Sequence, residues 1–346
     1  MTLSPWKPSP GYLNTASFGI PCPASAEAGH RIMSAWASGK LLFAEWLEEA
    51  LSVRFSIARL LSTSAANIAL GTSSSLMLHS VAASLPNGAQ VIVPGDEHNS
   101  NIIPYLNQAH RGVRVQVVPL SDLPTRITPG TTLVSCSAVQ SLSGEVVDLQ
   151  SIRQATRGVG ALFCLDATQA CGWLPLSANA ADIIVCSMFK WLCGPIGGAF
   201  LAMDPEAARR LRPATPSWVS RVDAFAAAYG TDFVLAPAAS RFDLIPNLVS
   251  MIGSKHNIDA IMGLGVDVIN RHNVSLANRL RCGLDMLPSN SAIVALPWQG
   301  AAQKLAASGV VASEWRGKLR LSFHLGNSEE DVKAALEVLR PLRASR

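Results

Sequence analysis

Residues 181–203 read ADIIVCSMFKWLCGPIGGAFLAM, and a second apolar run, ALFCLD, precedes them at residues 161–166. Both runs are rich in aliphatic and β-branched residues and lack regular polar alternation. Short, continuously apolar runs are typical of strands buried on both faces of a parallel sheet. The two runs therefore predict the centre of an α/β fold, with Asp166 and Ser187 at strand ends.

Further apolar runs upstream end at Val93, Val118 and Val139. Helix-like segments at residues 99–111 and 148–157 stand between the runs. Strands that alternate with helices imply crossover connections and a mainly parallel sheet with helices on both faces. We therefore predict an α/β fold for the larger part of the chain.

The two ends of the chain follow other patterns. Residues 23–39 and 45–61 carry apolar residues at three- and four-residue spacing, which predicts amphipathic helices. Beyond about Pro213 the pattern is less regular, and the chain closes with a strand, a turn and a helix that starts near Asn327. This end predicts a smaller α+β domain.

The composition excludes several classes of function. Of the 346 residues, 49% are hydrophobic and 15% are charged, which excludes a disordered chain. The net charge is only +4 and no run of basic residues occurs, so we expect no nucleic-acid partner. No apolar run approaches the roughly 20 residues of a membrane-spanning helix. We expect a soluble, cytoplasmic protein without a membrane partner.

The seven cysteines show no CxxC spacing, so neither a zinc site nor a disulfide framework is indicated. Cys136, Cys164 and Cys186 fall inside predicted strands, where a cysteine is typically a small buried hydrophobe. We therefore expect no metal site.

Polar residues follow the predicted strands. In a parallel sheet, ligands collect beyond the carboxyl ends of the strands. Five polar segments stand at such ends: GTSSS at 71–75, DEHNSN at 96–101, VQSLSG at 139–144, DATQ at 166–169 and SMFKWLCGPIGG at 187–198. Together they predict one site.

Each segment also has a purely structural interpretation. GTSSS opens a helix and could present N–H groups to a phosphate, or Thr72 or Ser73 could simply cap that helix. Asp166 could pair with a cationic ring nitrogen, or it could be a turn acid. Burial beside aromatic neighbours would make Lys190 a neutral nucleophile, although a lysine that reaches solvent is the alternative.

The segments are more specific in combination. A phosphate cradle, a carboxylate for a ring nitrogen and a lysine that forms a Schiff base are the requirements of pyridoxal 5'-phosphate (PLP). Asp166 and Lys190 stand on adjacent predicted strand ends. The sequence therefore favours a PLP site.

With these motifs in place, the chain resembles the class V aminotransferase family of fold-type I PLP enzymes. This family includes cysteine desulfurases, selenocysteine lyases, kynureninase and isopenicillin-epimerase-like proteins. The resemblance runs from YLNTASFG at 12–19 to LRLSFHLGNSEEDV at 319–332, with DEHNSNIIPYL, LDATQACG and ADIIVCSMFKWLCGPIGG as its most specific parts. It implies a PLP-binding large domain at 15–240, and a small domain formed by 1–14 and 241–346.

The resemblance also implies catalytic roles for three residues. Lys190 would form the Schiff base and shuttle the proton at the substrate α-carbon. Asp166 would keep the pyridine nitrogen protonated, and His98 would stack on the ring.

Other residues would bind the cofactor and the substrate. Gln140 and Gln169 would hydrogen-bond the phenolic oxygen of PLP. The phosphate would be held by Ser73, Ser74, Ser75 and Ser187. Arg320 would clamp the substrate α-carboxylate, because a planar bidentate donor suits that task. Asn14 would line the substrate pocket. Without the family, Arg320 and Asn14 read as a surface strand residue and a turn residue.

The chain departs from the family pattern in three places. Phe189 stands where many relatives carry a histidine that contacts the phosphate. Ile245 stands where relatives often carry a hydroxyl that reaches the partner subunit's phosphate, although a homodimer is still expected. No cysteine lies between Cys282 and Arg320, where desulfurases carry a persulfide-forming cysteine.

These observations predict an enzyme that acts on an α-amino acid through a Schiff base and a quinonoid. The leading prediction is β-elimination by a C–S lyase on a cysteine conjugate. The alternatives are an aminotransferase, an epimerase, a decarboxylating deaminase, or a desulfurase without a relay cysteine. A PLP-fold protein without turnover is the alternative from a different class.

Overall fold

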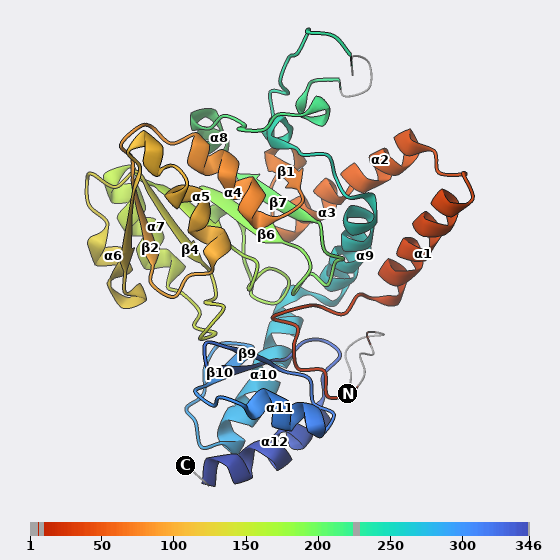
Figure 1. The fold of residues 1–346 in the computed structure, drawn as a ribbon, viewed down its shortest axis with the longest axis vertical. Helices are drawn as coiled ribbons and strands as arrows, with labels where there is room; N and C mark the ends of the chain where they lie inside the picture. Colours follow the sequence, from red (N-terminus) through yellow and green to blue (C-terminus); the bar gives the residue numbers. More distant parts are fainter. Residues whose placement is uncertain (1–5, 7–9, 224–228, 345–346) are drawn as a thin grey trace.

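The fold was analysed in a computed structural model that describes residues 6, 10–223 and 229–344. A larger body built around a sheet lies above a smaller body in Figure 1, and the chain passes between them more than once. The prediction of an α/β fold with a mainly parallel sheet and a smaller α+β part is confirmed.

The larger body is organised by a seven-stranded sheet. Its strands lie in the order β1 (Ile68–Gly71), β7 (Ala199–Met203), β6 (Ile183–Ser187), β5 (Leu162–Asp166), β4 (Leu133–Ser137), β2 (Gln90–Pro94) and β3 (Arg114–Val118). All pairs from β6 to β3 are parallel, whereas β7 runs antiparallel to both of its neighbours. Since β1 and β6 are both antiparallel to β7, they run in the same direction. Both therefore end at the edge of the sheet that carries Asp166.

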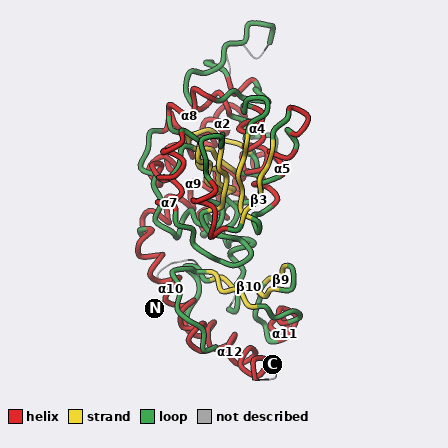
Figure 2. The backbone as a smooth tube through the Cα atoms, turned by 90° about the vertical axis from the view of Figure 1, so that its left-hand side faces the viewer, coloured by secondary structure: helices red, strands yellow, loops and turns green. Residues whose placement is uncertain are grey.

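Alternate residues of each strand feed two separate cores. In β6, Ile184 and Cys186 pack with one core, while Ile183 and Val185 pack with the other. The strands lie between layers of helices in Figure 2. Burial on both faces explains why these strands read as continuous apolar runs.

One face of the sheet is covered by helices that come from both ends of the sequence. These are α1 (Pro23–Ala37), α2 (Phe43–Leu51), α3 (Val53–Leu60), α7 (Leu149–Val159) and α9 (Leu248–Leu264). The other face is covered by α4 (Ser74–Ala83), α5 (Ile103–Leu106) and α8 (Pro205–Arg210). The helix predicted at 45–61 is divided at Ser52 into α2 and α3, and α6 (Leu123–Arg126) is a single turn.

Short 3₁₀ turns join these elements. They lie at Ala65–Asn67, Asn99–Asn101, Ala109–Arg111, Leu120–Asp122, Ala178–Ala180, Trp218–Ser220 and Ala239–Phe242.

The smaller body has its own antiparallel sheet and core. Its elements are α10 (Val266–Gly283), β8 (Ile293–Leu296), α11 (Ala301–Ala307), β9 (Ser313–Trp315), β10 (Lys318–Ser322) and α12 (Glu329–Ala344). Leu13 packs into this core, and single bridges pair Tyr12 with Val311 and Asn14 with Ser322.

The division into 15–240 and 1–14 plus 241–346 stays a proposal. The pairing of Tyr12 and Asn14 with the smaller body supports the first boundary. The helix α9 packs against α1, α2 and α3 of the larger body and leads directly into α10. It is therefore the element through which the two parts share their packing.

Across the described ranges, the search for a helix with the length and hydropathy needed to cross a membrane found none. Within the same ranges, histidine, cysteine, aspartate and glutamate side chains form no cluster suited to a metal ion.

Candidate active site

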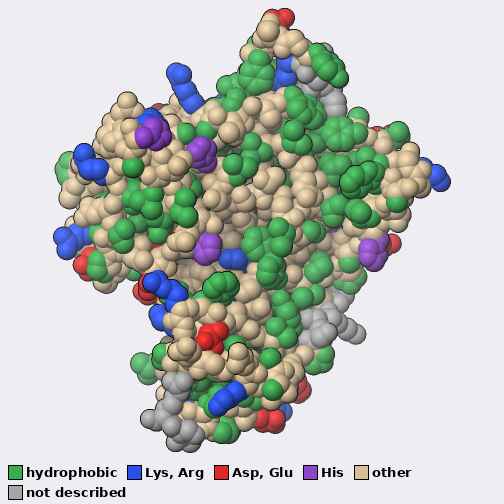
Figure 3. All heavy atoms as spheres, viewed as in Figure 1, with side chains coloured by type: hydrophobic (Ala, Val, Ile, Leu, Met, Phe, Trp, Pro, Cys, Tyr) green, Lys and Arg blue, Asp and Glu red, His purple; other side chains and the backbone are tan. Residues whose placement is uncertain are grey.

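The predicted polar segments meet at one edge of the large sheet. An inner cavity of about 130 Å³ opens there, and an outer cavity of about 730 Å³ adjoins it. His98, Ser141, Phe189 and Lys190 line both. In Figure 3 the surface is hollowed between the two bodies, with histidine and Lys or Arg side chains in the hollow.

The inner cavity ends in a cup of hydroxyl groups, which we call the hydroxyl cup: Ser73, Ser74, Ser75, Thr168 and Ser187. The Ser74 Oγ lies 2.7 Å from the Ser187 Oγ and 3.2 Å from the Thr168 Oγ1. Ser74 is the first residue of α4 and its N–H donates to the Ser187 Oγ at 3.0 Å, so the N-terminus of this ten-residue helix lies at the cup. The Ser73 side chain caps α4 by accepting from the Leu76 N–H. Of the two alternatives that the sequence left open, the helix cap by Ser73 is therefore observed, and the anion site stays a prediction.

Asp166 is the last residue of β5 and is only 5% exposed. Its Oδ1 accepts a hydrogen bond of 2.8 Å from the Thr168 N–H, which fixes the carboxylate at the inner cavity. Within the described part of the chain, no arginine or lysine forms an ion pair with Asp166, so this buried carboxylate can serve a cationic group of a bound molecule.

Lys190 follows β6 in a tight loop whose backbone is held by the N-terminal segment. The Gly19 N–H donates to the Phe189 carbonyl at 2.9 Å, and a Cβ at position 19 would collide with the Lys190 carbonyl oxygen. Burial lowers the pKa of the Lys190 amine to about 8, and repulsion from Arg320 adds to this effect while Asp166 opposes it. At pH 7 roughly one tenth of this amine is thus neutral and nucleophilic, far more than in an exposed lysine.

His98 lies at the entrance to the inner cavity, next to the buried Glu97. Burial lowers the pKa of the His98 imidazole, and Lys190 reinforces this, so the ring is neutral near pH 7. The His98 Nδ1 accepts from the Ser100 N–H at 3.2 Å, which leaves the ring proton on Nε2. Glu97 accepts from the Ser137 N–H at 2.6 Å and from the His98 N–H at 2.9 Å, so it ties this loop to the end of β4.

Arg320, on β10 of the smaller body, reaches into the outer cavity. It is 5% exposed, and its guanidinium donates to the Ser141 carbonyl, the Ser141 Oγ and the Ser17 Oγ, each at 2.8 Å. Burial lowers its pKa to about 10. No carboxylate of the described residues forms an ion pair with it, so a buried cation stands ready for an anionic ligand.

Gln169 lies at the floor of the site and reaches the residue that holds Arg320. Its Nε2 donates to the Ser141 Oγ and to the Ala16 carbonyl, both at 3.0 Å, and its Oε1 accepts from the Trp191 Nε1 at 2.8 Å. Ser141 is therefore shared between Gln169 and Arg320.

Two predicted residues do not line either cavity. Gln140 is buried behind Glu97, to which its Nε2 donates at 3.3 Å, while its Oε1 has no partner among the described residues. Asn14 pairs with Ser322 through its backbone, and within the same ranges its buried Oδ1 also lacks a partner. The structure brings the other predicted residues together: Lys190, Asp166, His98, Ser73, Ser74, Ser75, Gln169 and Ser187 around the inner cavity, and Arg320 in the outer one.

The sequence prediction missed several residues of the site. Thr168 stands within the DATQ segment and completes the hydroxyl cup, so its position could have been recognised. Ser17 and Ser141 hold Arg320, but nothing in their local sequence indicates this contact. Asp96 and Arg316 also line the outer cavity: Asp96 opens the predicted DEHNSN segment but was given no role, and Arg316 was not predicted.

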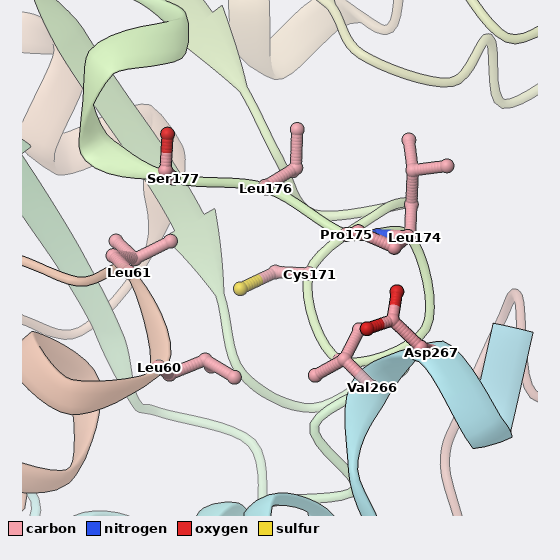
Figure 4. Close-up of a pocket in the computed structure, with 10 residues that line it drawn as sticks. Leu60, Leu61, Cys171, Leu174, Pro175, Leu176, Ser177, Val266 and Asp267 are labelled. Carbon is pink, nitrogen blue, oxygen red and sulfur yellow. The ribbon is translucent and has the colours of Figure 1, made fainter.

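A third cavity, of about 360 Å³, contains none of the predicted residues. Leu60, Leu61, Leu174, Leu176 and Val266 form most of its wall, and the Cys171 side chain lies among them (Figure 4). It lies where α3 and the first turn of α10 meet the loop that follows Gly172.

A cup for a phosphate, a buried carboxylate, a lysine with a lowered pKa and an uncompensated arginine fit PLP and an amino acid. These features define a PLP-dependent enzyme. Comparisons with known proteins agree: a family model described as aminotransferase class-V matches residues 45–304. The chain belongs to this family, which confirms the predicted family, enzyme class and cofactor.

Relatives and solved structures add detail. A probable cysteine desulfurase of Methanothermobacter thermautotrophicus is 29% identical over 205 residues, which cover 56% of this chain but only 50% of the relative. The aminotransferase YcbU of Bacillus subtilis is 26% identical and is matched over 85% of this chain and 84% of its own length.

Among solved structures, the cysteine desulfurase of Thermococcus onnurineus is 20% identical, with a TM-score of 0.85 over 97% of this chain and 95% of that one. The cystine C–S lyase C-DES, solved with cysteine persulfide, is 19% identical, with a TM-score of 0.85 over 96% and 97%. At these identities the structures show a shared fold.

Proposed function

We propose that this protein is a C–S lyase that performs β-elimination on a cysteine conjugate. The products are a thiol and a three-carbon enamine that water converts to pyruvate and ammonia. The observation that carries the proposal is a cavity that joins Lys190, Asp166 and Arg320 but has no cysteine among its described lining residues.

PLP, when bound, supplies an electron sink for the negative charge that develops at the substrate α-carbon. The Asp166 carboxylate holds a proton on the ring nitrogen and is oriented for this by the Thr168 N–H. The hydroxyl cup and the N-terminus of α4 bind the phosphate. His98 would lie against the ring, and because burial lowers the pKa of its imidazole, it would bring no positive charge to the cofactor near pH 7.

Lys190 is proposed to form the covalent link to the cofactor and then to move the α-proton. A free amine with a pKa of about 8 can accept a proton from the α-carbon and later return it. Cleavage of the Cβ–S bond sends its electron pair to sulfur, which leaves as a thiolate.

Arg320 is proposed to bind the substrate α-carboxylate with its planar fork. Ser141 and Ser17 hold the guanidinium before the substrate arrives, so little side-chain entropy is lost on binding. This contact orients the α-carbon towards Lys190. Asn14 and Gln140 keep their proposed roles only if their side chains turn towards the cavity.

The hairpin of β9 and β10 favours a lyase over a desulfurase. A desulfurase needs a thiol that takes the sulfur atom, and the last cysteine of this chain is the exposed Cys282. The hairpin closes at Arg316 and Gly317 without a cysteine. The C-DES structure, whose name is that of a C–S lyase, shares this fold.

The test is a panel of S-substituted cysteines, cysteine and ordinary amino acids incubated with the PLP-loaded protein. Pyruvate, thiol, alanine and racemised substrate are each measured. Thiol and pyruvate in equal amounts support the lyase. Alanine with sulfane sulfur would select the desulfurase instead. Conversion of an amino acid to its 2-oxo acid without loss of the sulfur substituent would select a transaminase.

A binding protein without turnover is the second candidate. It predicts that the purified protein either fails to take up PLP or takes it up and converts no amino acid. Loss of the visible PLP absorbance in Lys190→Ala, together with turnover by the unaltered protein, would exclude this candidate.

We also propose a homodimer. Ile196 and Ile245 are 64% and 50% exposed, and they lie on neighbouring loops because Gly197 approaches Asn247. Exposed isoleucines on adjacent loops offer apolar surface to a second copy. Light scattering on the purified protein tests this proposal, and a monomer mass would contradict it.

A further inference from the structure

The outer cavity extends beyond what an α-amino acid head group needs. At about 730 Å³ it lies within the ~300–1,000 Å³ range of sites for drug-sized ligands. Its wall includes the apolar side chains of Phe18, Leu142, Phe189 and Trp315. A substrate held by Arg320 would therefore direct its side chain along an apolar collar.

Two opposite charges stand beyond this collar. Asp96 comes from the loop after β2 in the larger body, and Arg316 comes from the β9–β10 turn in the smaller one. The Arg316 Nη1 lies 3.7 Å from the Asp96 Oδ1, and the two side chains are 76% and 59% exposed. An exposed pair of this kind contributes little stability, so a ligand can replace either partner at small cost.

The backbone presents Arg316 in an unusual way. Trp315 pairs with Lys318, so Arg316 and Gly317 form a two-residue hairpin loop with φ values of +49° and +74°. Such loops strongly favour Asn-Gly or Asp-Gly, because both residues need positive φ. An arginine at this position accepts backbone strain, which is common where a side chain serves a ligand.

We propose that Asp96 and Arg316 select substrates whose sulfur substituent ends in a second amino-acid group. This inference rests on the proposed lyase function and names its substrate class. The far ammonium would pair with Asp96 and the far carboxylate with Arg316. A substituent with one charge would satisfy one of these groups and face the other as a like charge, and a neutral substituent would satisfy neither.

L-lanthionine is the probe, because its two alanine units are joined by a thioether that no reductant cleaves. Elimination breaks one Cβ–S bond, and with one water it yields cysteine, pyruvate and ammonia, so no oxidant or reductant is needed. S-ethyl-, S-carboxymethyl- and S-(2-aminoethyl)-L-cysteine complete the set with no distal charge, a carboxylate alone and an ammonium alone.

We expect the kcat/KM of the holoenzyme for lanthionine to exceed that for S-ethyl-cysteine at least tenfold. About 0.5 M salt should shrink this preference, because the charges are exposed. Arg316→Asn, which suits the turn, should lower the ratio of lanthionine to S-(2-aminoethyl)-cysteine about fivefold or more. Asp96→Asn should do the same for the ratio of lanthionine to S-carboxymethyl-cysteine.

The matched control is Arg126→Gln, which removes an arginine from an exposed pair with Asp122 on α6, outside the residues that line the cavity. It should leave every ratio unchanged. Equal cleavage of lanthionine and S-ethyl-cysteine, or ratios that neither substitution changes, would overturn the inference and leave the lyase function standing. If none of the four compounds yields pyruvate, the lyase function itself is wrong and this inference falls with it.

Discussion

The inner and outer cavities are built on opposite principles. The inner one is formed almost entirely at the strand ends of one sheet, and its groups are buried and bonded to one another, as Ser74 is to Ser187 and Thr168. The outer one is assembled from loops of both bodies, and its charged rim at Asp96 and Arg316 is exposed. The comparison separates a cavity built by one sheet, where we propose that the cofactor binds, from an entrance built by loops of both bodies, where we propose that substrates are selected.

The largest effect is expected from a substitution in the inner cavity. Asp166→Ala should lower kcat about 10³-fold, or roughly 4 kcal/mol of barrier, because the ring nitrogen loses the carboxylate that keeps it protonated. The melting temperature should change little by comparison. Steady-state kinetics with saturating PLP measures the effect, and activity within about tenfold of the unaltered protein would show that Asp166 lacks this role.

The second-largest effect is expected from a substitution in the outer cavity. Arg320→Ala should raise KM for an active amino acid by about 10- to 100-fold, because a charge-assisted hydrogen-bonded pair contributes roughly 1.5–3 kcal/mol. Arg320→Lys should restore only part of this, since an ammonium cannot form the bidentate contact. An unchanged KM in Arg320→Ala would contradict carboxylate binding.

A smaller effect concerns the hydroxyl cup. Ser74→Ala should weaken PLP binding about tenfold, because one donor to the phosphate is lost and Thr168 and Ser187 lose a shared partner. Equilibrium titration of the cofactor-free protein by absorbance measures this constant. Ser308→Ala, at an exposed position after α11, is the control and should bind PLP normally.

The smallest effect is a shift along the pH axis. Only the neutral Lys190 amine reacts with PLP, so the rate of capture by cofactor-free protein should rise with pH and reach half its maximum near pH 8. Arg320→Gln removes a repelling charge, which raises the pKa of Lys190 and moves the curve to higher pH. Asp166→Asn removes an attracting charge and moves it to lower pH. Shifts in the opposite directions would show that these charges do not act on Lys190.

The sequence predicted the inner cavity better than the outer one, and the reason is physical. Asp166 and Lys190 follow strands that are recognisable as apolar runs. Because the carboxyl ends of parallel strands share one edge of a sheet, their proximity could be predicted from the sequence alone. GTSSS was placed at a strand end, but the bounds of β1 were not predicted, because four residues before a polar turn carry little pattern. Gln140 was expected at the cofactor, but its amide is held by the buried Glu97, a contact that depends on how two loops pack.

The outer cavity depends on pairings between distant segments. Ser17 meets Arg320 because the N-terminal segment lies beside β10, and Ser141 meets it from the loop after β4; no local motif indicates either contact. Asp96 and Arg316 belong to different bodies, so their approach follows from how those bodies sit together. For the β9–β10 hairpin, the sequence predicted only a strand and the lack of a cysteine before Arg320.

The contacts of the N-terminal segment also determine in which order parts of the protein can fold during synthesis. Ser322 donates to the Leu13 carbonyl across 309 positions of chain, and Gly19 supports the loop of Lys190. At about 5–20 residues per second, residue 13 waits roughly 15–60 s for this partner to be synthesised. The large sheet can form in that interval, whereas the contact between Leu13 and Ser322, and the contact between Ser17 and Arg320, must wait until residues 320–322 have been made.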